Sequence, residues 1–256
     1  MNQAKIVKKM DIKDVHEFHP KNVIKNTSNC MLCGEPLIYL TNNEMKTCTF
    51  CGNVFSANAV CKKNHYVCDT CHGADAYAFS KEFLTHTELA DLVGTLNALR
   101  SHQSFNLHGP EHHYAIAGVI PAVYKNMGGN ISNDDILTAM DRATAIPGGS
   151  CGFWGGCGAS LGAGIGFGVI LGSNPLKPKR RQTLIKIVTE ISGELAKVTA
   201  ARCCQRECWT ALKKASEISE KYIGISLPAD ENVICTQMDR NKECIKSACQ
   251  FYHKQP

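Results

Sequence analysis

The sequence has few aromatic residues, no long uninterrupted apolar run and no strong excess of one charge. Only 7% of the 256 residues are aromatic, which argues against the base-stacking surfaces of single-strand nucleic-acid binders. Residues 1–10 are polar and lysine-rich, without the apolar core of a secretory signal. We therefore expect a cytoplasmic protein.

The charge distribution also argues against nucleic acid as a partner. The formal net charge is +5, and thiolates gathered around metal ions would lower it. Between Cys30 and Asp75 three lysines stand against four carboxylates, whereas a phosphate-binding surface needs clustered Lys and Arg. The tight basic run Lys177–Arg181 is typical of a solvated loop before a helix.

An uncharged stretch between residues 148 and 172 is a poor candidate for a membrane span. It contains eleven glycines, and its purely apolar part, Leu161–Leu171, is too short to cross about 30 Å of hydrocarbon. Glycines recur at every fourth residue in two sets, Gly158, Gly162, Gly166 and Gly164, Gly168, Gly172. This pattern predicts a buried helix with two faces of small residues that allow close packing.

Cysteine is the abundant residue, with fifteen in the chain. In a reducing cytoplasm such a number favours metal ligation or redox chemistry over disulfides. Two Cys-x2-Cys-Gly knuckles and a Cys-x3-His-x2-Cys-x2-Cys segment supply eight candidate ligands: Cys30, Cys33, Cys48, Cys51, Cys61, His65, Cys68 and Cys71. Two-residue spacing lets both sulfurs of a turn face one ion, so the segment predicts two tetrahedral structural zinc sites.

The sequence leaves the pairing of these ligands open. Sequential pairing places the first four around one ion and the last four around the other. Cross-braced pairing joins Cys30 and Cys33 to Cys61 and His65, and Cys48 and Cys51 to Cys68 and Cys71. The adjacent His72 is an alternative ligand to His65.

A histidine cluster and a second set of cysteines are candidates for chemistry. His108, Glu111 and His112 stand at the start of a predicted helix, either as acid, base or ligand groups or as polar caps. Cys157 also precedes a helix, which predicts a lowered thiol pKa. The candidate cofactor ligands are Cys151, Cys157, Cys203, Cys204 and Cys208, with Cys235, Cys244 and Cys249 further along. Three to five of these cysteines could hold an iron–sulfur cluster. Alternatively, Cys151 and Cys157 could act as a redox dithiol.

Two resemblances involve these residues. The segment Cys157-Gly-Ala-Ser-Leu-Gly162, followed by Leu171-Gly172, resembles the core of a family described as redox-active and named for its spaced Cys, Gly-Cys-Ala and Gly signature. The whole chain, through its knuckles, its His108–His113 segment and its terminal cysteines, resembles a domain family of unknown function from anaerobic bacteria and methanogens. That resemblance implies an anaerobic cytoplasm and no established reaction.

The fold expected is α+β, a small two-zinc ribbon or finger module followed by a mostly α-helical domain. The expected boundaries are a polar arm at 1–29, the zinc module at 30–73 and the helical domain at 74–256. Helices are predicted over 111–127, 136–145 (capped by Ser132), 181–201 and 204–222, with a capping box at Thr85–Glu88 and short strands at 37–40 and 54–55.

Two functional hypotheses follow. The first is an enzyme that uses thiols or an iron–sulfur cluster for redox or sulfur-handling chemistry, with a redox partner protein. The second is a non-catalytic zinc-stabilised module that binds another protein or a second copy of itself. Neither predicts a nucleic-acid or membrane partner.

Overall fold

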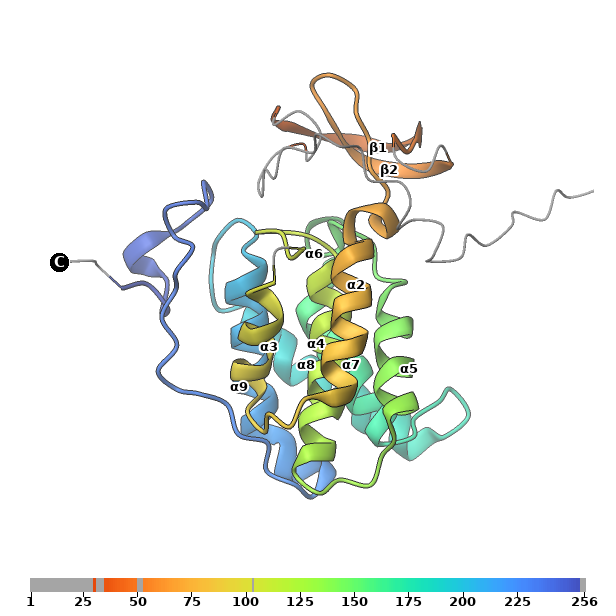
Figure 1. Ribbon diagram of the computed structural model, residues 1–256, viewed down its shortest axis with the longest axis vertical. Coiled ribbons are helices and arrows are strands. Elements are labelled where there is room, and N and C mark those ends of the chain that lie inside the picture. Colours follow the sequence, from red (N-terminus) through yellow and green to blue (C-terminus); the bar gives the residue numbers. More distant parts are fainter. Residues whose placement is uncertain (1–29, 31–34, 50–52, 103, 254–256) are drawn as a thin grey trace, which may run out of the picture. The chain divides into compact units, whose positions relative to one another are not determined.

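The computed structural model describes residues 30, 35–49, 53–102 and 104–253, with only the backbone described for Cys71 and for 73–75 (Figure 1). The chain divides into two compact units, one that ends at Asp75 and one that begins at Ala76. The boundary falls inside α2 (Asp69–His86). The predicted α+β class is confirmed, because a two-stranded sheet lies in the first unit and a set of helices in the second.

The first unit contains an antiparallel hairpin of β1 (Leu37–Thr47) and β2 (Val54–Cys61). Leu37 pairs with Cys61 at the open end of the hairpin, and Cys48 follows β1 directly at its turn. Both strands are longer than predicted because most side chains of β1 are polar and exposed, so hydrophobic alternation marks only its first residues. Among the described residues of the hairpin, Cys61 therefore stands at the open end and Cys48 at the turn.

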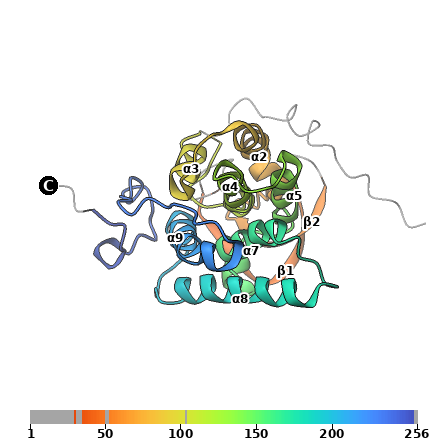
Figure 2. The same ribbon diagram turned by 90° about the horizontal axis from the view of Figure 1, so that it is seen from below.

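The second unit is a bundle built around α4 (Glu111–Asn126), which Figure 2 shows end-on. Residues 111–123 of α4 are all buried. The helices packed on α4 are α3 (Leu92–Arg100), α5 (Asn133–Ala143), α7 (Gly158–Ile170) and α9 (Cys204–Ile223); α8 (Pro178–Leu195) packs on α7 and α9, and α6 (Ser150–Phe153) is a single turn. Among the described residues, none of the helices combines the length and apolarity that a membrane crossing requires.

The two glycine faces predicted for α7 are confirmed. A Cβ atom at Gly162 would lie 2.5 Å from the backbone oxygen of His113 on α4, and one at Gly166 would lie 2.9 Å from that of Ala117. Gly164 faces α8 instead, where a Cβ would lie 2.3 Å from a methyl group of Val188. Side chains larger than hydrogen would push these helices apart, so the glycines allow α7 to lie between α4 and α8.

The helix ends partly agree with the sequence prediction. Ser132 caps α5 in a capping box with Asp135, as expected at the start of that helix. The capping box predicted at Thr85–Glu88 is wrong, because Thr85 belongs to the last turn of α2. Asp91 caps α3 instead and accepts a 2.7 Å hydrogen bond from the N–H of Gly94.

The segment after α9 folds back along that helix. Phe251 stacks edge-to-face on Trp209 of α9, with 5.1 Å between ring centroids. The N–H of Cys235 donates to the carbonyl of Phe251 at 2.8 Å, which closes the segment into a loop. Apart from the short 3-10 turn η1 (Lys246–Ala248), this part of the chain, up to His253, has no regular secondary structure.

Candidate metal centres and thiol sites

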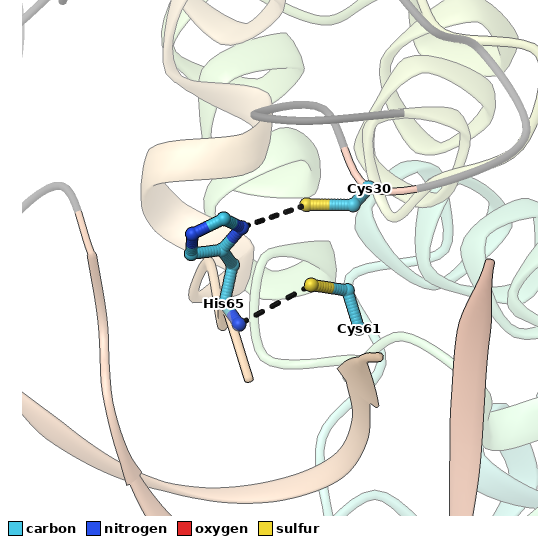
Figure 3. Close-up of side chains that lie close together, drawn as sticks. All are labelled: Cys30, Cys61 and His65. Carbon is cyan, nitrogen blue, oxygen red and sulfur yellow. Dashed lines mark hydrogen bonds between the residues drawn. The ribbon is translucent and has the colours of Figure 1, made fainter. Parts of the chain in front are cut away.

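Cys30, Cys61 and His65 form a compact group at the open end of the hairpin (Figure 3). Their ligand atoms all lie within 4.8 Å of one another. The Cys30 Sγ is 3.7 Å from the Nδ1 of His65, and the backbone N–H of His65 donates to the Sγ of Cys61 at 3.3 Å. Both thiols are buried. Two sulfurs and an imidazole nitrogen at this spacing could supply three corners of a tetrahedral metal site.

Cys48 and Cys68 come together at the other end of the hairpin. The N–H of Cys68 donates to the Sγ of Cys48 at 3.3 Å. The N–H of Thr49 donates to the carbonyl of Tyr66 at 2.7 Å, which holds the turn against the chain that follows β2. Cys48 is 1% exposed and Cys68 is 2% exposed, so the pair is enclosed by protein.

These contacts distinguish the two pairings that the sequence leaves open. Cys30 lies with Cys61 and His65, and Cys48 lies with Cys68, as cross-braced pairing requires. Sequential pairing would need Cys30 beside Cys48. Of the other candidate ligands, Cys33 and Cys51 lie outside the described residues, and so does the side chain of Cys71.

Arg100, which no sequence motif indicates, connects the polar side chains in the interior of the helical unit. Its guanidinium donates to the Nε2 of His112, and to the side-chain oxygens of Gln205 at 2.8 Å and Gln237 at 2.7 Å. The Nδ1–H of His112 donates to the carbonyl of Gly109 at 3.1 Å. Burial and the nearby Arg100 cation lower the pKa of His112 to about 3. His112 is therefore neutral, with both ring nitrogens engaged.

The other members of the histidine segment are also buried. Glu111 is fully buried and accepts a 2.9 Å hydrogen bond from the N–H of Asn106. His108 is 6% exposed, and its Nε2 lies 3.1 Å from the side-chain oxygen of Asn241. Burial lowers the pKa of His108, and the positive charge of Arg202 lowers it further by a smaller amount. The segment thus links the start of α4 to the chain beyond α9.

The structure does not bring the five predicted cofactor cysteines to one place. Cys157 and Cys204 lie close enough to Cys208 for their thiolates to raise its pKa, and a Cys151 thiolate likewise raises the pKa of Cys157. Cys151 is exposed on α6. Cys203 is buried and lines a different cavity.

The thiol of Cys157 differs from the sequence prediction. Cys157 does precede α7 as its N-cap residue. Burial nevertheless raises its pKa to about 12, and the N–H groups of Ala159 and Ser160 oppose this with a smaller effect. The prediction of a lowered pKa is therefore wrong, because desolvation of the thiolate outweighs the helix terminus.

Four cysteines line one cavity between the start of α9 and the C-terminal segment. They are Cys203, Cys235, Cys244 and Cys249. The cavity is small and partly open to solvent. All four are among the late cysteines that the sequence offers as cluster ligands, but this particular set could not be predicted, because its convergence depends on how the C-terminal segment folds back.

The two units define a cysteine-rich protein with a buried Cys/His candidate metal site and a thiol-rich helical bundle. The chain belongs to the family of unknown function DUF5714, whose profile matches residues 80–252. The matched region lies within the helical unit and does not include the N-terminal unit with its cysteines. No curated protein and no solved structure matches the chain.

Proposed function

We propose that this protein is a cytoplasmic metalloprotein with two structural zinc ions in its N-terminal unit and a cysteine-lined site for redox or sulfur-handling chemistry in its helical unit. The observation that carries the proposal is the group of Cys30, Cys61 and His65, with three ligand atoms within 4.8 Å of one another. Thiolate and imidazole together are the ligands that zinc prefers in structural sites.

The surroundings of these ligands support a structural role for the metal. The four described cysteines of this unit, Cys30, Cys48, Cys61 and Cys68, are all at most 5% exposed. The unit contributes few large apolar side chains of its own to a core, so metal ligation would supply its folding energy. None of the described cysteines forms a disulfide, which agrees with a reducing compartment.

Chemistry in the helical unit is supported by the position of Arg100. Its guanidinium is desolvated by burial and lies within electrostatic range of Cys208, Cys204 and Cys203. A buried cation among thiols favours anionic sulfur, either a thiolate or a bound sulfur anion, and here it opposes the burial that raises the pKa of Cys204 and Cys208. A bundle core without a chemical role would gain little from such a group, because hydrogen bonds to neutral partners repay only part of the cost of burying a cation.

A non-catalytic interaction module is the second candidate. Trp154 is 68% exposed and Phe153 is 47% exposed, next to the exposed Cys151. Aromatic side chains of this size at a surface are typical anchors of protein interfaces. A stable complex with a partner or a second copy, lost on Trp154→Ala, together with an absence of any redox activity, would favour this candidate.

Metal analysis of the full chain tests the zinc proposal. We expect two zinc ions per chain after anaerobic purification, and about one in Cys30→Ser and in Cys48→Ser. The control Cys151→Ser, which changes an exposed thiol on α6, should keep both ions. One zinc or none in the unaltered protein would contradict the proposal.

Cobalt substitution tests the cross-braced order with a variant that keeps its metal. Cys30→His leaves four ligands at each site. Cross-braced pairing then gives one site with two thiolates and one with four, whereas sequential pairing gives two sites with three each. The cobalt absorption bands report the number of thiolates. Two identical three-thiolate spectra would exclude the cross-braced order.

A further inference from the structure

The cavity at the start of α9 has the composition of a metal-cluster site. Its four thiols come from distant parts of the chain: Cys203 caps α9, Cys235 lies in the segment after it, and Cys244 and Cys249 flank η1. The backbone bond from Cys235 to Phe251 and the stacking of Phe251 on Trp209 fix the segment that carries the last three. Four cysteines around one cavity are rarely a packing accident, since a cysteine in a core needs no thiol neighbours.

Hydrogen bonds toward two of the sulfurs support thiolate ligands. The N–H of Lys246 donates to the Sγ of Cys244 at 3.3 Å. Lys246 has a φ of 48°, a left-handed conformation that costs a non-glycine residue free energy and that directs this turn. The Nε2–H of Gln205 donates to the Sγ of Cys235 at 3.5 Å. Such N–H groups stabilise metal-bound sulfur and tune its electronic properties.

Positive charge lies behind the same sulfurs. The side-chain oxygen of Gln205 accepts a 2.8 Å hydrogen bond from Arg100, and its amide N–H donates to the Sγ of Cys235. The Arg206 side chain also lines the cavity, beside Cys203. Several thiolates around one centre carry net negative charge, which Arg100 offsets in part, whereas the charge of Arg206 is shared with its ion-pair partner Glu207.

The four sulfurs are not arranged as the ligands of a single ion. Within the described part of the chain, Cys30, Cys61 and His65 are the one group of three or more candidate ligand atoms within 4.8 Å of one another. No three of the four cavity sulfurs are therefore that close. Around one zinc ion, with Zn–S near 2.3 Å, tetrahedral sulfurs are about 3.8 Å apart, whereas a cluster spreads its thiolates over several iron atoms.

We propose that Cys203, Cys235, Cys244 and Cys249 hold an iron–sulfur cluster. This inference names a cofactor for the helical unit and rests on the redox part of the proposed function, but it is independent of the zinc ions. Of the eight late cysteines that are candidate cluster ligands from the sequence, it selects these four, and it excludes Cys151, Cys157, Cys204 and Cys208 as ligands.

The experiment is metal and sulfide analysis of the full chain, purified without oxygen and, in parallel, reconstituted with ferrous iron and sulfide. We expect iron with acid-labile sulfide, a brown charge-transfer absorption, and an electron paramagnetic resonance signal in one redox state. Cys235→Ala and Cys244→Ala should lower the iron content by about tenfold or more while zinc stays unchanged. The matched controls Cys151→Ser and Cys157→Ser should keep iron and spectrum.

Each result separates this inference from the zinc proposal. Retained zinc and an unchanged helical circular dichroism signal show that a variant without iron is still folded. Iron that is absent even after reconstitution, or that is lost in Cys157→Ser and kept in Cys235→Ala, overturns the cluster assignment and leaves the zinc sites intact. A third zinc ion that depends on Cys235 also overturns it. Iron without zinc would support the cluster and contradict the zinc sites.

Discussion

Arg100 and His112 illustrate how a single buried pair fixes the polar interior of the helical unit. Arg100 ends α3, yet its guanidinium reaches α4, α9 and the C-terminal segment. Because the guanidinium can only donate, it forces the Nε2 of His112 to accept and places the proton on Nδ1, which faces the carbonyl of Gly109. His112 therefore links Arg100 to the carbonyl of Gly109 as a neutral ring.

The depressed pKa of His112 predicts acid sensitivity. The folded state keeps this ring neutral down to about pH 3, whereas an unfolded histidine binds a proton below about pH 6.5. Between these values only the unfolded state gains the proton, so the unfolding free energy falls as the pH falls. At pH 5 the loss from this ring is about 2 kcal/mol relative to pH 7.

Urea unfolding followed by circular dichroism between pH 7 and pH 5 measures this loss. His112→Gln should reduce the slope of the unfolding free energy against pH, whatever its effect on stability at pH 7. The exposed His86→Gln should keep the original slope. Equal slopes in all three proteins would show that His112 does not titrate as the structure indicates.

At the scale of elements, the glycine faces of α7 set the distances within the bundle. Gly162→Ala should destabilise the protein by about 2 kcal/mol, because its Cβ would lie 2.5 Å from a backbone oxygen and 2.6 Å from Ile116. Gly193→Ala on α8 is the matched control. It meets nothing within 4 Å, so its higher helix propensity should stabilise by up to about 1 kcal/mol. Urea titration should give opposite signs, and a stabilising Gly162→Ala would refute the packing argument.

The sequence predicts those elements whose structure depends on residues close together in the chain. The repeat of Gly162 and Gly166 and the cap at Ser132 act over one or two helical turns, so they are visible without the fold. The box at Thr85 has the right residues but does not start a helix, because α2 extends to His86 and includes Thr85 in its last turn. Arg100 and Cys235 have no local signal, since their partners lie up to 137 residues away in sequence.

At the scale of the whole molecule, the chain divides stability between two different sources. The helical unit has a continuous apolar core that runs from Tyr77 to Phe251. The N-terminal unit contributes buried cysteines and a hairpin whose first strand is largely exposed. The family match begins at residue 80, so the part of the chain shared with that family is the part with its own apolar core.

If the N-terminal unit holds the zinc ions proposed above, this division predicts that removing them unfolds that unit alone. Lys46 of β1 pairs with Phe55 of β2 in the hairpin. A strong zinc chelator under reducing conditions should expose Lys46 to rapid trypsin cleavage, because the metal-free hairpin lacks folding energy. Lys213 on α9 should stay protected, and the helical circular dichroism signal should largely persist. Adding back zinc should restore protection at Lys46. Protection that survives full zinc removal would show that the hairpin folds without metal, and simultaneous cleavage at Lys213 would show that the two units unfold together.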